Sequence, residues 1–370
     1  MTLVLTVNAG SSSLRLALHR AQGGTLEACA DVHHDRDAGP PAALLHDFIA
    51  AHAGAPVDLV AHRVVHGGPR FGVPRRVDAG VESEIERLSA LAPLHHPAAL
   101  AWIRACRDEF GDGVEQVAVF DTAFHAGMPA AAASYALPHA LAERHGLRRY
   151  GFHGIAHRAL WSRWCALRPD LPEGGRLVTL QLGAGCSACA IERGRSVDTS
   201  MGYSPLEGLM MATRCGDIDP ALPIALQREA GLAPAEVERL LATQSGLLGV
   251  SGLSADMRVL LASDDARSRL AVEMFCHRAR KVLGGYLAVL HGADGIVFGG
   301  GIGENAPAVR EHILDGFEWA GLALDAAANA ACVGREACIS RPDSRIQAWV
   351  VPVDEAHELA SQALSVRNTA

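Results

Sequence analysis

One local pattern, present once in each half of the chain, constrains the fold most strongly. It consists of an apolar strand, a turn of small residues and a second apolar strand, and it reads LVLTVNAGSSSLRLAL at residues 3–18 and RLVTLQLGAGCSACAIE at residues 176–192. Apolar alternation on both sides of a glycine-bearing turn predicts two strands joined by a tight connection. The recurrence of the pattern predicts a duplicated α/β architecture with one such turn in each half.

These turns differ from the common nucleotide-binding loops. In a dinucleotide-binding Rossmann unit or a P-loop the glycine loop opens a helix, whereas here each turn leads into a strand. The only lysine, Lys281, is followed by a valine, so the GK[ST] sequence of a P-loop is absent and a protein-kinase lysine is hard to place. Backbone N–H groups in such turns can still bind phosphate. A ligand held between the two halves fits the usual location of binding sites.

Composition limits the partners and the compartment. The formal net charge of −8, without a basic block, argues against a nucleic-acid or anionic-membrane binder. The apolar run Leu3–Val7 is too short for a signal peptide, and no segment approaches the roughly 18 apolar residues of a membrane span. Nine scattered cysteines favour a reducing compartment over a disulfide framework. We therefore expect a cytoplasmic protein that binds neither nucleic acid nor membranes.

The CxxC pair formed by Cys186 and Cys189 is a separate question. A zinc site of this kind usually needs a second pair of ligands. We expect both thiols to pack in the interior.

The NAGSSS turn and the residues beside it could bind an anion and a metal. Asn8 offers a carbonyl oxygen that could hold a metal ion or its water. Arg15, just inside the second strand, could pair with a phosphate. The alternative is an ordinary Gly/Ser turn without a ligand.

Two charged residues lie in or directly after apolar strands. Arg63 in AHRVVHGG either reaches a sheet edge or is buried with an anionic partner, because buried arginines are rare unless paired. A substrate carboxylate would suit its planar fork, and a structural salt bridge is the alternative. Asp121 in VFDTAFH follows an apolar strand, the position where α/β proteins place functional groups.

A histidine and an arginine complete the charged candidates. His153 in RRYGFHGIAHR has HxxxH spacing with His157, but the segment lacks the glutamate of a zincin helix. A phosphate-facing histidine and a packed core histidine both remain open. Arg214 is the one cation before Asp217 in DTSMGYSPLEGLMMATRCGDIDP, and such an arginine can stabilise charge during phosphoryl transfer.

Two segments near the C-terminus also carry candidates. The run VFGGGIGENAPAVR, residues 297–310, is a strand, a glycine run and a helix start, which could let a nucleotide approach the backbone. Glu355 in WVVPVDEAHELA could ligate Mg²⁺ directly or through water. Its alternative role is a carboxylate that favours the N-terminus of a helix.

Taken in this order, these segments resemble the acetate kinase family. The matching stretches are NAGSSSLR, HRVVHGG, PLHHP, FDTAFH, YGFHG, LGAG, DTSMGYSPLEGLMMATRCGDIDP, SADMR, GGIGENAPAVR and VPVDE. The resemblance implies a duplicated actin/sugar-kinase/Hsp70-like (ribonuclease H-like) α/β fold with the active site in a cleft. We expect an N-terminal domain at residues 1–130, on which the helix 356–370 packs back, and a C-terminal domain at 131–355 that carries the nucleotide site.

The resemblance also implies a reaction and a role for each candidate. The reaction is reversible, Mg²⁺-dependent (or Mn²⁺-dependent) transfer from ATP to acetate, giving acetyl phosphate and ADP, by a homodimer whose contact we place on residues 266–291. Asn8 and Glu355 lie near the metal, Arg63 binds the carboxylate, and the catalytic residues are Asp121, His153 and Arg214. The implied ATP contacts are Arg15, Gln181, Leu182, Gly183, Ala184, Gly185, Asp256, Met257, Arg258, Gly301, Ile302, Gly303, Glu304 and Asn305.

Three positions depart from the family pattern. Arg15 replaces a lysine, so the cation is kept with a different geometry. Gln181 and Ala184 replace the histidine and the asparagine of HLGNG, which removes two polar groups from the phosphate side of the expected ATP site. The alternatives are a propionate or butyrate kinase, and a non-catalytic, chaperone-like ATPase of the same fold.

Overall fold

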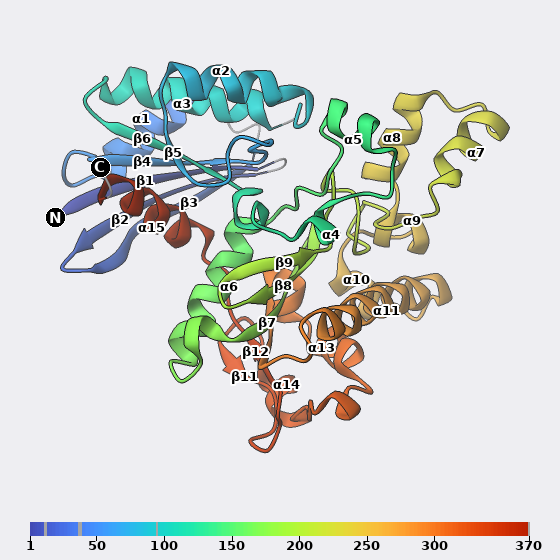
Figure 1. The fold of residues 1–370 in the computed structure, drawn as a ribbon. Coiled ribbons are helices and arrows are strands. Elements are labelled where there is room, and N and C mark those ends of the chain that lie inside the picture. The colour runs from blue at the N-terminus through green and yellow to red at the C-terminus, as the bar shows by residue number, and fades with distance from the viewer. Residues whose placement is uncertain (11–12, 36–38, 94, 369–370) are drawn as a thin grey trace. The chain divides into compact units, whose positions relative to one another are not determined.

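A computed structural model describes residues 1–10, 13–35, 39–93 and 95–368 of the protein (Figure 1). The chain divides into two compact units built from several segments each. The first unit comprises Met1–Ala126, Phe152–Ala159 and Asp354–Ala370, and the second comprises Gly127–Gly151 and Leu160–Val353. Compactness alone does not show that a unit folds independently, so the domain boundaries expected at residues 130 and 355 stay a prediction.

A six-stranded mixed sheet forms the centre of the first unit. Its order is β3-β2-β1-β4-β6-β5, in which β1, β4 and β6 are parallel and the other neighbours are antiparallel. The strands are β1 (Thr2–Ala9), β2 (Ser13–Gln22), β3 (Thr25–Asp35), β4 (Leu59–Val64), β5 (Arg75–Arg76) and β6 (Glu115–Phe120). The helical elements of this unit are α1 (Pro41–His52), α2 (Ala79–Arg87), η1 (Leu88–Ala90), α3 (His96–Phe110), η2 (Ala123–His125), the start of α6 (Gly154–Leu167) and α15 (Glu355–Asn368).

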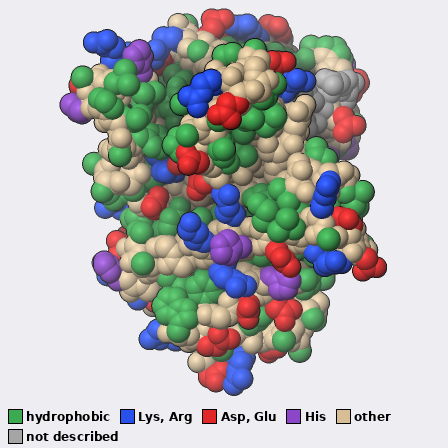
Figure 2. Space-filling view, turned by 90° about the vertical axis from the view of Figure 1, so that its right-hand side faces the viewer, with side chains coloured by type: hydrophobic (Ala, Val, Ile, Leu, Met, Phe, Trp, Pro, Cys, Tyr) green, Lys and Arg blue, Asp and Glu red, His purple; other side chains and the backbone are tan. Residues whose placement is uncertain are grey.

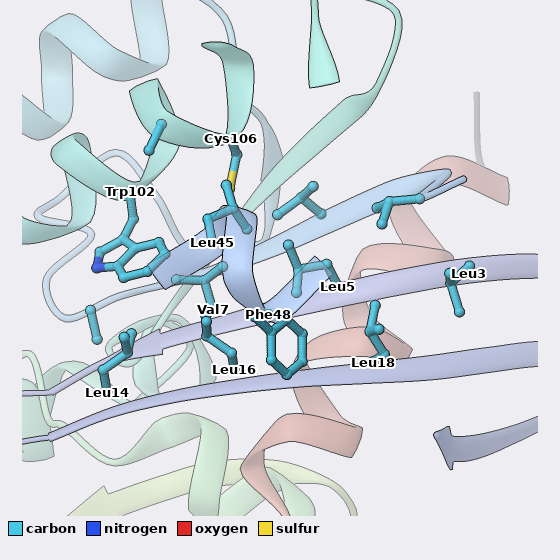
Figure 3. Close-up of a cluster of buried hydrophobic side chains, with 14 residues drawn as sticks. Leu3, Leu5, Val7, Leu14, Leu16, Leu18, Leu45, Phe48, Trp102 and Cys106 are labelled. Atoms are coloured by element: carbon cyan, nitrogen blue, oxygen red, sulfur yellow. The ribbon is translucent and has the colours of Figure 1, made fainter. Parts of the chain in front are cut away.

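The two faces of this sheet are covered by different helices because successive side chains of a strand point to opposite sides. Leu3, Leu5 and Val7 of β1 pack against residues of α1 and α3, among them Phe48 and Trp102 (Figure 3). The intervening Val4 belongs instead to the cluster that includes residues 359–363 of α15. Each fully buried aliphatic side chain of this kind contributes about 1.5–3 kcal/mol to folding.

The second unit repeats the topology of the first. Its sheet has the order β11-β12-β10-β7-β8-β9, with β10 parallel to β7 and β12 and antiparallel pairing elsewhere. Read from β9, this is the arrangement of the first sheet read from β3. The strands are β7 (Arg176–Leu182), β8 (Cys186–Glu192), β9 (Arg195–Thr199), β10 (Gly295–Gly299), β11 (Ala337–Cys338) and β12 (Gln347–Val350). The duplicated α/β fold expected from the two strand–turn–strand patterns is confirmed.

Helices surround this second sheet. The longest is α11 (Ala266–Val289), which begins at Asp265, whose carboxylate accepts the N–H groups of Arg267 and Ser268. The only lysine, Lys281, is exposed on α11. The other helical elements are α4 (Ala130–Ala133), α5 (His139–His145), the end of α6, η3 (Pro172–Gly174), α7 (Ala221–Glu229), α8 (Pro234–Thr243), α9 (Gly246–Ser251), α10 (Met257–Leu261), α12 (Gly300–Asn305), α13 (Pro307–Leu314), η4 (Glu318–Ala320) and α14 (Ala326–Ala331).

The distribution of charge on the surface agrees with the absence of a basic block in the sequence. On the face drawn in Figure 2, positive and negative side chains are interspersed, without a large area of one sign. Within the described ranges, no helix has the length and apolar character needed to cross a membrane.

Cys186 and Cys189 are both fully buried in β8, and burial raises the pKa of the Cys186 thiol to about 12. The CxxC pair is therefore interior packing, as expected.

Several histidines of the first unit are buried, which links its stability to pH. His62 Nε2 donates a hydrogen bond to Gln116 Oε1 over 2.6 Å, and burial lowers the pKa of His62 to about 4. Burial lowers the pKa of His66 and His125 to about 4 as well. In the unfolded chain these groups titrate near 6.5, so between about pH 6.5 and pH 4 the unfolded chain binds more protons than the folded one.

We therefore predict that the contribution of these histidines to the free energy of unfolding is fully present above about pH 6.5. This contribution should decrease as the pH falls toward 4. The midpoint of urea unfolding should decrease from pH 7.5 to pH 5, and His62→Gln should weaken this decrease. His139→Gln, a change at an exposed histidine, is the control and should leave the decrease intact. An equal pH dependence in wild type and His62→Gln would contradict the prediction.

Candidate active site

Three expected site residues lie at the carboxyl ends of neighbouring parallel strands in the first unit. Asn8 is next to last in β1, Arg63 is next to last in β4, and Asp121 directly follows β6. Because β1, β4 and β6 are adjacent and parallel, these ends meet at one edge of the sheet, where α/β proteins place their ligands. The strand pattern thus explains why residues far apart in sequence gather here.

A continuous chain of hydrogen bonds joins these residues to Glu355, the first residue of α15. Asn8 Nδ2 donates to Glu355 Oε2 over 2.7 Å, and Arg63 Nη1 donates to Asn8 Oδ1 over 3.0 Å. Arg63 Nη2 and Nε donate to Asp121 Oδ2 over 2.6 and 3.0 Å. Of the two readings of Arg63, burial with an anionic partner is the one observed, and that partner is Asp121.

Burial and charge act in opposite directions on this pair. Burial disfavours the charged guanidinium, but the carboxylates of Asp121 and Glu355 more than compensate and raise the pKa of Arg63. Burial raises the pKa of Asp121 above its ordinary value, while Arg63 opposes that rise. The Arg63 side chain is 15% exposed and that of Asp121 only 2%, so the pair is shielded from water.

One oxygen of this cluster has no hydrogen-bond partner among the described residues. Asp121 Oδ1 is buried and accepts no hydrogen bond from the described residues. Mg²⁺ sites in phosphoryl-transfer enzymes commonly use one or two carboxylates together with substrate phosphates and water. Asp121 and Glu355, which are linked through Arg63 and Asn8, supply carboxylates of the kind that this donor set uses. Within the described ranges, no group of three or more His, Cys, Asp or Glu side chains is placed to hold a metal by itself.

The backbone places His153 directly beside Asp121. The N–H of Gly154 donates to the carbonyl oxygen of Asp121 over 2.8 Å, and a Cβ on Gly154 would lie 2.2 Å from that oxygen. His153 itself has φ +58°, a conformation that costs a non-glycine residue free energy and is often found at functional sites. The sequence YGFHG is thus folded into a tight turn that brings His153 next to the catalytic candidate.

Arg15 shares the face of the sheet that carries Asn8, since the two are direct cross-strand partners. Its guanidinium is bound by Asp31 of β3 through three hydrogen bonds of 2.5–3.1 Å, and Asp354 lies 3.8 Å away. The hydrogen bonding of Arg15 to the Asp31 carboxylate is the main cause of the raised pKa of Arg15. The expected phosphate contact is therefore occupied by a neighbouring carboxylate.

The first of the two repeated turns is described only in part. Gly10 N–H donates to the carbonyl oxygen of Ser13 over 2.8 Å, which closes the turn between β1 and β2. Ser11 and Ser12, whose hydroxyl groups were expected to face a phosphate, lie outside the described residues.

The second repeated turn, LGAG, joins β7 to β8 in the second unit. Gly183 N–H donates to Gly185 O over 3.1 Å, and Ala212 N–H donates to Ala184 O over 3.0 Å. Gln181 lies opposite Gly299 in the sheet, and its buried Oε1 accepts no hydrogen bond from the described residues. The turn is therefore tied to the segment that carries Arg214, and a polar atom next to it lacks a partner.

Arg214 lies in a segment whose backbone is fixed by hydrogen bonds. Its Nη1 donates to Pro205 O over 3.1 Å, and its own carbonyl oxygen accepts the N–H of Met211 over 3.2 Å. Ser245 N–H donates to Thr213 O over 2.9 Å. These bonds restrict the position from which the guanidinium projects.

An interaction that the sequence analysis did not identify supports residues 199–207, which precede the segment of Arg214. Arg149 Nη2 donates to Glu207 Oε1 over 2.5 Å, and the hydroxyl of Tyr135 donates to the other carboxylate oxygen. Arg149 Nη1 donates, over 3.1 Å each, to the carbonyl oxygens of Thr199, Ser200 and Met201. The sequence signal that could have identified Arg149 is its position directly before the apolar YGF run.

The expected nucleotide segment Gly301–Asn305 lies within the short helix α12. Gly300 begins it with φ +77°, and a Cβ there would lie 2.7 Å from Leu182 O, so only glycine permits this approach to the LGAG turn. Glu304 folds back, and its Oε1 accepts the N–H groups of Gly300 and Val353 over 2.9 and 3.1 Å. Glu304 thus holds the backbone of the glycine run.

The remaining expected segment, Asp256–Arg258, forms a local structure at the start of α10. The Asp256 carboxylate accepts the backbone N–H of Arg258 over 2.9 Å and also pairs with its guanidinium. The bond from Arg258 lowers the pKa of Asp256 to about 2. Met257 between them is buried, whereas the Arg258 side chain is 88% exposed.

Comparison with known proteins shows the family of the chain. The model of the Acetokinase family matches residues 41–361. An acetate kinase of Solibacter usitatus is 53% identical over 303 residues, which cover 81% of this chain and 73% of that protein. The crystal structure of Porphyromonas gingivalis acetate kinase has a TM-score of 0.89 at 34% identity, with 99% of this chain and 100% of that chain covered. A propionate kinase from Francisella tularensis has the same TM-score at 33% identity, with the same shares covered. The chain belongs to the acetokinase family.

Proposed function

We propose that the protein is an acetate kinase, which transfers a phosphoryl group reversibly between ATP and acetate with Mg²⁺. The observation that carries the proposal is the hydrogen-bonded chain from Glu355 through Asn8 and Arg63 to Asp121, found in a member of the acetokinase family. This chain places two carboxylates and a guanidinium at one end of the sheet. Phosphoryl transfer depends mainly on such positioning and charge stabilisation.

The acceptor needs no general base. A short carboxylic acid has a pKa similar to that of glutamate, about 4.3, so it is ionised near pH 7. The obstacle is the approach of one anion to another. Arg63 and Arg214 are the groups that relieve this repulsion, and His153 adds a donor at the transferring phosphoryl group. We assign the carboxylate to Arg63 and the phosphoryl group to Arg214.

Asp121 and Glu355 are the residues that would hold Mg²⁺, together with Asn8. When bound, the ion neutralises charge on the phosphate oxygens. Asp121 is already in contact with Arg63, and its second oxygen accepts no hydrogen bond from the part of the chain that the structure describes. Its role is therefore to orient Arg63 and to offer that oxygen to the metal or its water, and it has no proton to remove from an ionised acid.

The acceptor could instead be propionate. The similarity to a protein named propionate kinase supports this second candidate. The phosphoryl donor is a related question, because Gln181 and Ala184 stand where the family has a histidine and an asparagine. We retain ATP as the donor, with the segment Gly301–Asn305 at the nucleotide. A non-catalytic ATPase is disfavoured, because Arg63, Asp121, His153 and Arg214 are all retained.

The decisive experiment traps the product. Acyl phosphate is converted to hydroxamate while acetate, propionate and butyrate are compared as acceptors, with ATP or pyrophosphate as donor. We expect the highest kcat/KM with acetate and ATP, no product in EDTA, and recovery on addition of Mg²⁺. ATP binding without carboxylate-dependent product would contradict the proposal, and a preference for propionate would select the second candidate.

Arg214→Ala should lower kcat by on the order of 10³-fold, the usual effect of losing an arginine that stabilises the transferring group. Arg228→Ala, at an exposed arginine paired with Glu229, is the matched control and should keep wild-type turnover. Both variants are measured by initial rates at saturating substrates. Turnover of Arg214→Ala within a few-fold of wild type would remove this residue from the mechanism.

We also propose that the enzyme is a cytoplasmic homodimer. Helix α11 leaves Leu270 and Val289 about half exposed, at 48% and 47%, which suits a partner contact. Light scattering on the purified protein should give twice the chain mass, and Leu270→Glu should shift it toward the monomer. A monomeric wild-type protein at micromolar concentration would contradict this assignment.

A further inference from the structure

Arg310 in helix α13 is a fully buried arginine whose charge the proposed reaction does not use. Its relative exposure is 0%, and it occupies the interior face of the helix with Val309, Ile313 and Leu314. An apolar side chain would be expected at this spacing. Burial lowers the pKa of Arg310, as it does when a charged group loses water.

The guanidinium is satisfied entirely by oxygen atoms of carbonyl groups. Nη1 donates to Gly303 O and Glu304 O over 2.8 and 3.1 Å, and Nη2 donates to Asn329 O and Cys332 O over 3.0 and 2.6 Å. Nε donates to the side-chain Oδ1 of Asn329 over 2.9 Å. Five hydrogen bonds from one side chain thus join three consecutive helices.

Two of these helices end at the guanidinium. Gly303 and Glu304 belong to the last turn of α12, and Asn329 and Cys332 lie at the end of α14. The last carbonyl groups of a helix have no partner within the helix and carry partial negative charge. A buried cation is therefore stabilised here without a carboxylate, and in return it fixes both helix ends.

The other end of α12 is fixed as well. Glu304 Oε1 accepts the N–H of Gly300, and Gly300 lies so close to Leu182 O that a Cβ would not fit there. The N-terminal end of the glycine run is held by Glu304 and its C-terminal end by Arg310. The backbone between them is the segment that the proposed function assigns to the nucleotide.

We propose that Arg310 is a positioning residue for the nucleotide, acting through the backbone of residues 300–305. A site ordered in advance loses less conformational entropy when its ligand binds, and Arg310 supplies that order. The inference rests on the proposed function, in which this segment contacts ATP. It is independent of the acceptor, because the hydrogen bonds of Arg310 to the described residues run to the glycine run and to the end of α14.

The test compares three variants of the full-length protein. Arg310→Met removes the guanidinium and puts an unbranched apolar side chain of similar length in its place. Arg310→Lys retains a cation with fewer donors in a different geometry. Asn329→Ala is the matched control, because it removes one acceptor of the same guanidinium and leaves the bonds to Gly303 and Glu304 in place.

We expect Arg310→Met to raise the KM for ATP about tenfold or more and to change the KM for acetate less than about twofold. Arg310→Lys should lie between it and wild type, and Asn329→Ala should shift the KM for ATP less than about threefold. An unchanged KM for ATP in folded Arg310→Met, or an equal rise in both KM values, would overturn the inference.

A second measurement covers the case in which Arg310→Met does not fold. Hydrogen exchange of the peptide that spans residues 299–306 should be faster in Arg310→Lys than in wild type, while that of β8 stays the same. Equal exchange in the two proteins would then overturn the inference. If wild type forms no acyl phosphate, the proposed function fails, whereas calorimetric ATP affinities of wild type and Arg310→Lys still test the role of Arg310.

Discussion

The buried pair of Arg63 and Asp121 is the interaction on which the first unit's candidate site depends. Its charges are almost completely removed from water, so each is tolerated only because the other is present. Removal of one partner from a buried ion pair typically costs about 3–5 kcal/mol, since the remaining charge is left uncompensated. The pair also spans the ends of β4 and β6, and Asn8 extends it to β1 and α15. The same hydrogen bonds and ion pair therefore set the geometry of the candidate site and hold the strand ends together.

The segments of the second unit that the proposed function assigns to the nucleotide are built in a different way. They use few charges and many backbone contacts, in which glycine allows approaches that a Cβ would prevent. Gly300 against Leu182 O is one example, and Gly246, whose Cβ would lie 2.2 Å from Met211 O, is another. Such a surface presents N–H and C=O groups to a ligand at close range. The candidate residues of the two equivalent sheets therefore differ in their contacts, which are ionic in the first unit and made mainly by the backbone in the second.

Much of this could be predicted from the sequence, because the relevant signals are local. Alternating apolar residues around two small-residue turns predicted the duplicated sheets, and an apolar strand ending at Asp121 predicted its position at a sheet edge. The partners of these residues could not be predicted from local spacing, because the contacts join distant segments. Asn8 and Glu355 are 347 residues apart, and only the family resemblance placed them together, while no spacing rule connects Arg15 to Asp31. The roles of Arg149, Glu304 and Arg310 were missed for the same reason, since each binds backbone carbonyl or N–H groups, which every residue has.

The outer strands of the two sheets have a further consequence. On one side each sheet ends in a strand of only two residues, β5 and β11. On the other side of the first sheet, the eleven-residue β3 carries Glu27, Asp31 and Asp35. An unprotected outer strand is a template for pairing with another chain, and short or charged outer strands prevent this. The two-residue edges and the acidic β3 are therefore poor templates for pairing with strands of another chain.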